Sequence, residues 1–124
     1  MILSSLENRE ETMKITEKTK VNVVVLKFVG SLLGEPDTTK VRRKVRRLVE
    51  EEVRKVVVDM SDLRWINSDG LGSLIAGLSS LRNAGGDLRL AKVSDNVQKL
   101  LRITGLAKVF KVYSTVDAAV NRFK

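Results

Sequence analysis

The chain has 124 residues, 43% of them hydrophobic and 31% charged, a composition typical of one soluble globular domain. It contains no cysteine and no histidine, which excludes disulfides and thiolate chemistry and removes the commonest general base and metal ligand. Lys and Arg number 23 against 15 Asp and Glu, and this net charge of +8 favours nucleic acid or an acidic protein surface as a partner.

The first twelve residues show no apolar period and carry Glu7, Glu10 and Glu11 in place of the apolar segment of a signal peptide. We expect residues 1–12 to be a flexible extension and residues 13–124 to form one domain. No apolar run approaches the roughly 18 residues that a membrane span requires. We therefore expect a cytoplasmic protein.

Two strands are predicted at the start of the domain. Residues 13–16 alternate apolar and polar side chains, which is typical of a half-buried strand. Residues 21–29 carry valine, leucine and phenylalanine on both faces, as in a strand that is covered on both sides. We expect the two strands to form a hairpin that turns at residues 17–20.

A loop at residues 30–39 leads into the first predicted helix. It contains the only proline, Pro36, and the acidic residues Glu35 and Asp37 beside that proline favour a helix start. The apolar stripe of this helix comprises Val41, Val45, Leu48 and Val49.

The opposite face of this helix is strongly basic. It carries Lys40, Arg42, Arg43, Lys44, Arg46 and Arg47. A solvated helix face explains these charges, and we expect all six to be exposed. A docking surface is the alternative, although the absence of aromatic side chains disfavours stacking against single-stranded nucleic acid.

The next strand, at residues 55–59, is predicted to turn at residues 61–63 and to lead into a second helix. The apolar face of that helix comprises Leu71, Leu74, Ile75 and Leu78. Ser68 occupies the expected N-cap position. Gly70 and Gly72 would each cost the first turn about 1 kcal/mol relative to alanine, so we expect a group to approach the backbone there. The free N–H groups of this helix end suit an anion.

The remaining segments continue the alternation of helix and strand. A turn at residues 83–86 precedes a strand at Leu88, Leu90 and Ala91, and Ser94 caps a helix that stops at Gly105. A strand is expected at residues 109–113, and a final helix is expected to begin with a capping box from Ser114 to Asp117. The whole pattern predicts an α/β domain with a mixed sheet of about five strands and about four helices.

The hexapeptide at residues 67–72, Asn-Ser-Asp-Gly-Leu-Gly, resembles the Asp-Ser-Ser/Thr-Gly-Leu-Gly signature of bacterial anti-sigma factor antagonists, the STAS domain family. By element order the resemblance extends from about Met13 to Phe123. Asn67 replaces the usual Asp, and Asp69 replaces a second Ser or Thr. The resemblance implies that the signature loop and the loop before the first helix share one end of the sheet, where α/β sites gather.

The resemblance also implies a non-enzymatic switch that needs no cofactor. Such a protein binds an anti-sigma factor with serine kinase activity, and Ser68 matches the serine that this partner phosphorylates. The residues implied in partner binding are Glu35, Trp65, Asn67, Asp69, Gly70 and Leu71. The charge of Asp69 would either impede phosphorylation or mimic it in part. From its position alone, Trp65 is interpreted as a core residue, with an interface anchor as the alternative.

Three other functions are weighed against this one. A nucleic-acid-binding module would use the basic helix at residues 40–47. A STAS subunit of a transporter or a larger signalling complex would share the fold. An enzyme ranks last, because the chain lacks a Walker loop, histidine and a metal-binding cluster. Asp59 and Asp62 are interpreted as strand-end and turn residues rather than as a metal pair.

Overall fold

The computed structural model describes residues 13–123, so the expected flexible extension at residues 1–12 lies outside the described residues. The strands are β1 (Met13–Lys20), β2 (Val23–Leu32), β3 (Lys55–Ile66), β4 (Asp87–Ala91) and β5 (Val112–Tyr113). The helices are α2 (Asp37–Glu50), α3 (Ser68–Asn83), α4 (Asp95–Ile103) and α5 (Val116–Asn121). No helix among residues 13–123 is both long enough and apolar enough to cross a membrane.

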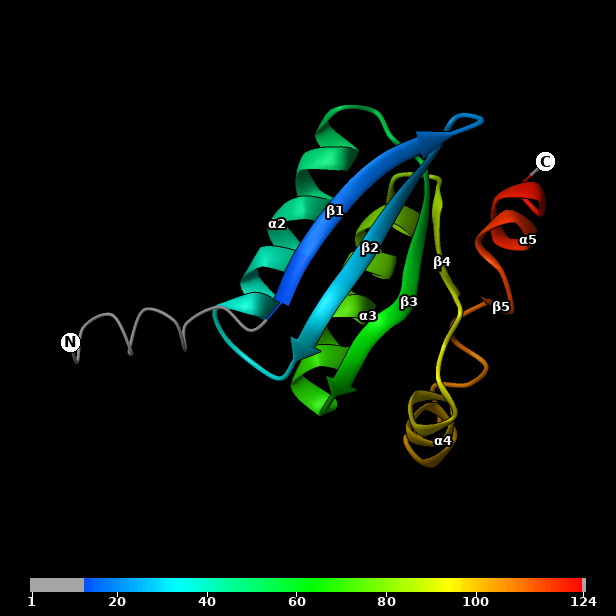
Figure 1. Cartoon of the computed structure of the whole chain (residues 1–124). Helices are drawn as coiled ribbons and strands as arrows, with labels where there is room; N and C mark the ends of the chain where they lie inside the picture. Colours follow the sequence, from blue (N-terminus) through cyan, green and yellow to red (C-terminus); the bar gives the residue numbers. More distant parts are fainter. Residues whose placement is uncertain (1–12, 124) are drawn as a thin grey trace.

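The five strands form one mixed sheet in the order β1-β2-β3-β4-β5 (Figure 1). β1 is antiparallel to β2, and the other neighbours are parallel. The parallel strands are added in one direction and such crossovers are right-handed, so α2, α3 and α4 are all required to cover the same face. The predicted α/β class, with about five strands and about four helices, is confirmed for the described residues.

Two apolar clusters hold these layers together. The larger lies between the sheet and the first three helices, and Phe28, Val58 and Leu74, each at most 1% exposed, represent its components. The smaller lies on the opposite face, where α5 covers Val25 and Val57. Most of the buried apolar side chains therefore lie on the face that α2, α3 and α4 cover, and fewer lie on the face that α5 covers (Figure 1).

The C-terminal segment is held against the sheet by a buried cation. The guanidinium of Arg89 lies 3.9 Å from the ring centroid of Phe123 and 5.9 Å from that of Tyr113. Its Nε also donates a hydrogen bond of 3.2 Å to the carboxylate of Asp87. Aromatic faces and a carboxylate thus compensate for the desolvation of a side chain in a residue that is only 9% exposed.

The hairpin is confirmed, but its predicted turn is wrong. Residues 17–20 belong to β1, and the chain reverses at Val21 and Asn22, whose φ angles are 50° and 69°. Two central residues with positive φ give the twist that a two-residue hairpin needs. A β-branched residue rarely adopts positive φ, so Val21 gave no turn signal.

β3 is longer than expected, because the predicted turn at residues 61–63 stays extended. Asp62 and Leu63 pair with Val29 and Gly30 of β2 through an irregular register. The Asp59 carboxylate accepts hydrogen bonds from the Ser61 backbone N–H at 3.0 Å and from its hydroxyl at 2.8 Å. The polar residues therefore mark an irregularity within the strand rather than its end.

Near the C-terminus two expectations change. β5 contains only Val112 and Tyr113, and the N-cap of α5 is Thr115 rather than Ser114. The Thr115 hydroxyl accepts a hydrogen bond of 3.0 Å from the Ala118 backbone N–H. The Ser94 cap of α4 is confirmed by the corresponding hydrogen bond.

The apolar stripe of α2 is confirmed, whereas the exposure expected for its six cations is only partly correct. Arg43, Arg46 and Arg47 are exposed, but Lys40, Arg42 and Lys44 are intermediate. The Lys40 side chain is 29% exposed and the Lys44 side chain 17%. These two lysines contact β1, which the sequence pattern of the helix alone does not reveal.

Candidate functional site

Asn67 joins the end of β3 to the start of α3. It is the N-cap residue, and its side-chain Oδ1 accepts a hydrogen bond of 2.9 Å from the Gly70 backbone N–H. The prediction of Ser68 as the N-cap is therefore wrong by one position, since Ser68 is the first helical residue. Asn and Ser rank almost equally as caps, so two adjacent candidates could not be separated by residue type.

The same Asn67 side chain ties two loops together. Its Nδ2 donates a hydrogen bond of 2.7 Å to the carbonyl oxygen of Leu33, just beyond β2. β2 and β3 are parallel neighbours and end at this side of the sheet (Figure 1). The expectation that the signature loop and the loop before α2 share one end of the sheet is confirmed.

Gly70 allows β2 to approach α3 closely. A Cβ atom on Gly70 would lie 2.3 Å from the Leu32 carbonyl oxygen and 2.7 Å from Cγ1 of Ile66. By contrast, a Cβ atom on Gly72 would meet nothing within 4 Å. The expected close approach is confirmed at Gly70 and is wrong for Gly72.

The first turn of α3 presents polar side chains outward and apolar groups inward. Ser68 and Asp69 are exposed, whereas Leu71 is only 1% exposed and Gly70 is buried. The backbone N–H groups of such a first turn lack intrahelical partners and form the positive end of the helix dipole. Ser68 is therefore accessible, and Gly70 and Leu71 shape the loop from inside.

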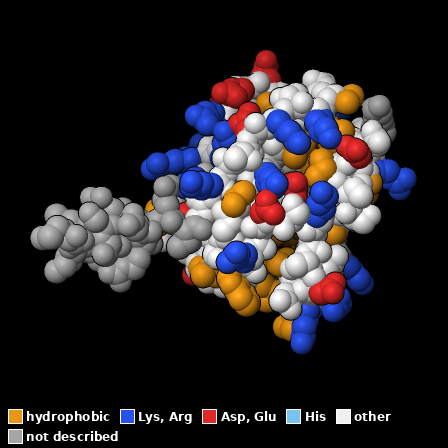
Figure 2. Space-filling view, in the orientation of Figure 1, with side chains coloured by type: hydrophobic (Ala, Val, Ile, Leu, Met, Phe, Trp, Pro, Cys, Tyr) orange, Lys and Arg blue, Asp and Glu red, His pale blue; other side chains and the backbone are white. Residues whose placement is uncertain are grey.

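Trp65 does not pack in the core, so the interpretation based on its position alone is wrong. The residue is 62% exposed at the end of β3, and Leu33 is 44% exposed. Trp65 pairs with Ser31 and Ile66 with Leu32, which places the tryptophan beside the chain that leads to Leu33. Figure 2 shows hydrophobic side chains gathered at the lower end of the molecule, where Figure 1 places the ends of β2 and β3.

Glu35 stabilises the start of α2. Pro36 is the N-cap residue of this helix, and the Glu35 Oε1 accepts hydrogen bonds from the Thr39 backbone N–H at 2.9 Å and from its hydroxyl at 2.6 Å. Donation from the side chains of Thr39 and Thr38 and from the Thr39 backbone lowers the pKa of the Glu35 carboxyl. Glu35 is exposed as a residue, although its carboxylate is already engaged by α2.

Among residues 13–123, no group of three or more His, Cys, Asp or Glu side chains could hold a metal ion. The two aspartates considered earlier have structural partners, since Asp59 accepts from Ser61 and Asp62 pairs with Lys27 at 2.9 Å. This hydrogen-bonded contact with Asp62 raises the pKa of Lys27. The interpretation of the aspartates as strand-end and turn residues is wrong in position, because both lie within β3, where each contacts a nearby side chain.

Leu32 and Leu33 contribute to the site but were not predicted from the sequence. They act through a backbone carbonyl that approaches Gly70 and one that binds Asn67. Every residue has a backbone carbonyl, so residue type does not indicate which carbonyl will contact the site. The available signal in the sequence was the glycine at position 70.

A family profile and individual relatives both match most of this chain. The sequence profile of the STAS domain matches residues 12–119. BtrV of Bordetella bronchiseptica is 25% identical over 112 residues, which cover 90% of this chain and 96% of BtrV. The anti-sigma-B factor antagonist of Listeria monocytogenes is 26% identical over 94 residues, which cover 76% of this chain and 82% of the relative.

Solved structures share the fold. The unphosphorylated form of the anti-sigma factor antagonist SpoIIAA superposes with a TM-score of 0.77 at 20% identity, covering 89% of this chain and 96% of SpoIIAA. The phosphorylated form of the Bacillus cell fate determinant SpoIIAA gives a TM-score of 0.70 at 18% identity, covering 90% of this chain and all of that one, 100%.

We expect Gly70→Ala to destabilise the protein by about 2 kcal/mol or more, because the added Cβ would overlap a backbone carbonyl. Gly72→Ala is the matched control in the same helical turn, and it should be neutral or stabilising by up to about 1 kcal/mol. Urea unfolding monitored by circular dichroism measures both changes. Equal destabilisation by the two substitutions would contradict the close approach at Gly70.

Two substitutions separate the roles of Asn67. Asn67→Ala removes the cap and the link to Leu33, and we expect it to cost about 1 kcal/mol or more. Asn67→Asp keeps the acceptor for Gly70 but turns a carboxylate oxygen toward the Leu33 carbonyl, so its stability should be intermediate. Urea unfolding measures the order of the stabilities. Of the two variants, only Asn67→Asp should keep the Gly70 amide protected from hydrogen exchange. Identical behaviour of the two variants would refute the double role.

Proposed function

The chain belongs to the STAS domain family, and from this premise we propose that it is an anti-sigma factor antagonist controlled by phosphorylation of Ser68. In this proposal the unmodified protein binds an anti-sigma factor with serine kinase activity in the cytoplasm and thereby frees a sigma factor. The names of the Listeria relative and of SpoIIAA support the antagonist role. SpoIIAA has been solved in unphosphorylated and phosphorylated forms, which supports a switch of this kind.

The observation that carries the proposal is the exposed position of Ser68 in the first turn of α3. A phosphate there would lie at the positive end of the helix dipole, beside backbone N–H groups without intrahelical partners. The α3 terminus therefore tolerates the added charge, and the fold survives modification. In this proposal the partner binds ATP and transfers its terminal phosphoryl group to Ser68, releasing ADP, and this chain needs no cofactor.

The surroundings of Ser68 explain how phosphate would end binding. Trp65 and Leu33 expose apolar surface beside the loop that contains Ser68, and tryptophan is a frequent anchor of protein interfaces. A phosphate carries about −1.5 to −2 charges at pH 7 and loses its hydration when a partner covers it. A partner that covers Trp65 would therefore also desolvate a phosphate on Ser68, so phosphorylation would prevent binding. Asn67 positions this loop, and Asp69 places one negative charge next to the acceptor hydroxyl.

We expect the anti-sigma factor, with ATP, to add one phosphate to the protein at Ser68. The partner is obtained by affinity capture from the source cell with and without ATP, and intact-mass measurement then counts the phosphates. Ser68→Ala should abolish labelling and retain binding, whereas the control Ser79→Ala, at an exposed serine later in α3, should be labelled normally. Ser68→Glu should weaken binding with little loss of stability.

Asp69→Ser tests the influence of the neighbouring charge, and faster labelling of this variant would show that Asp69 impedes the kinase. Phosphate at another residue, or on neither the wild type nor Asp69→Ser, would overturn the assignment of Ser68. Capture of a membrane transporter in place of an anti-sigma factor would favour the alternative role as a STAS subunit of a transporter.

Trp65 should anchor the partner. Trp65→Ala is expected to weaken binding to the purified anti-sigma factor by about tenfold or more, while its unfolding midpoint changes little because the side chain is exposed. The emission of Trp65, the only tryptophan, should shift when the complex forms. Unchanged affinity and emission at saturation would place the contact surface elsewhere.

A further inference from the structure

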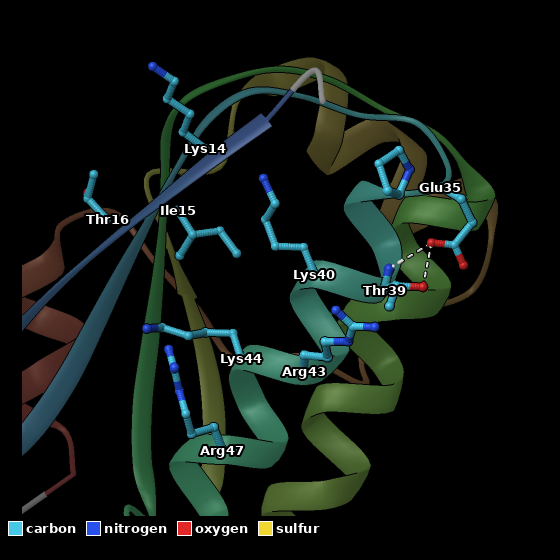
Figure 3. Close-up of a pocket in the computed structure, with 10 residues that line it drawn as sticks. Lys14, Ile15, Thr16, Glu35, Thr39, Lys40, Arg43, Lys44 and Arg47 are labelled. Atoms are coloured by element: carbon cyan, nitrogen blue, oxygen red, sulfur yellow. Dashed lines mark hydrogen bonds between the residues drawn. The ribbon is translucent and has the colours of Figure 1, made fainter. Parts of the chain in front are cut away.

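A basic groove with a volume of about 1050 Å³ lies between α2 and β1. Five of its lining residues are basic: Lys14, Lys40, Arg43, Lys44 and Arg47. The four that come from α2 have the spacing 0, 3, 4, 7, which places them on one face of the helix. Figure 3 shows Lys40, Lys44 and Arg47 extending from α2 on the side of β1, whereas Arg43 turns to the other side in this view. Lys14 extends from the strand away from α2.

Part of this charge is already compensated. Lys44 forms an ion pair with Glu17, and Lys40 donates a hydrogen bond of 2.9 Å to the Met13 carbonyl oxygen. Lys14, Arg43 and Arg47 have no ion pair with any residue between 13 and 123. The acidic residue that lines the groove, Glu35, is engaged by Thr39. Within the described part of the chain, the groove therefore retains positive charge that no ion pair neutralises.

Among residues 13–123, no strand pairs with the outer edge of β1, which runs along this groove. β1 lies at the end of the sheet and has β2 as its neighbour on one side only. Lys20 and Val23 close the two-residue hairpin, and hydrogen-bonded and non-hydrogen-bonded pairs alternate from there. Ile15 and Glu17 accordingly direct their backbone N–H and C=O groups outward, as the contact of Lys40 with the Met13 carbonyl also indicates.

We propose that the basic groove binds an extended acidic segment of a protein partner, which adds to β1 as a further strand. The segment's backbone would pair with the outward groups of Ile15 and Glu17, and its carboxylates on one face would meet Arg43 and Arg47. Pairing with β1 of a second copy is disfavoured, because Lys14, Lys18 and Lys20 would bring like charges together.

The observations favour an acidic peptide over nucleic acid. None of the described residues that line the groove has an aromatic side chain that could stack on a base. Ile15 and Pro36 supply apolar lining, and alternating backbone donors and acceptors match a peptide backbone. A nucleic-acid backbone offers acceptors but no matching row of N–H groups. Nucleic acid therefore becomes an outcome of the test.

The test uses the full chain and a fluorescein-labelled peptide of alternating Glu and Val, about nine residues long as in a typical strand. A Gln/Val peptide of the same length and a labelled oligo-dT and duplex DNA are the comparison probes. The double variant Arg43→Gln/Arg47→Gln removes two groove cations. Arg42→Gln/Arg46→Gln is the matched control, since it removes two arginines of the same helix at the same spacing that do not line the groove.

At low salt we expect the Glu/Val peptide to bind, and the groove double variant to weaken this binding about fivefold or more, while the control stays within about twofold. Amide exchange of Ile15 and Glu17 should slow when the peptide is bound. Urea unfolding of both double variants shows that each is folded.

Four results would overturn the proposal. They are no binding of the Glu/Val peptide at low salt, equal weakening by the two double variants, binding without protection of Ile15 and Glu17, and tighter binding of either DNA probe than of the peptide.

Discussion

The two hydrogen bonds of the Asn67 side chain are the constraint on which the site depends. The Oδ1 atom accepts from Gly70 and fixes where α3 begins, and the Nδ2 atom donates to the Leu33 carbonyl and fixes the neighbouring loop. One planar amide thus sets the separation between two parallel strand ends. At this separation the Leu32 carbonyl lies close to Gly70. A side chain at position 70 would occupy the same space as that carbonyl.

The order of the strands decides which surfaces are available for binding. Right-handed crossovers in one direction place α2, α3 and α4 on a single face and leave β1 at the edge. The ends of β2 and β3 then form one candidate surface, with Trp65, Leu33 and Ser68. The free edge of β1 and the adjacent face of α2 form another. The first combines exposed apolar side chains with an exposed serine hydroxyl, and the second combines backbone hydrogen-bonding groups with positive charge.

The effect of the net charge of +8 on binding depends on which of the basic side chains are already paired within the protein. Lys27 pairs with Asp62, Lys44 with Glu17 and Lys20 with Asp117, so part of the excess is compensated locally. Arg89 is covered by aromatic rings and contributes to the attachment of α5. Arg43 and Arg47 are exposed and have no ion pair among residues 13–123, so they belong to the part of the excess charge on which the proposed docking of an acidic segment depends.

The sequence by itself determined the fold class, the order of the elements and the helix faces, because apolar side chains recur with the periods of strands and helices. It also located the junction at residues 67–72, since cap residues and glycines act within a few positions of the chain. Short-range signals could not choose between Asn67 and Ser68 as the cap, because both side chains can make the same local hydrogen bond. Only the tertiary structure decided that choice, through the distant Leu33 carbonyl. It likewise decided the exposure of Trp65, the extension of β3 and the partial burial of Lys40 and Lys44, because each depends on contacts with segments far away in the sequence.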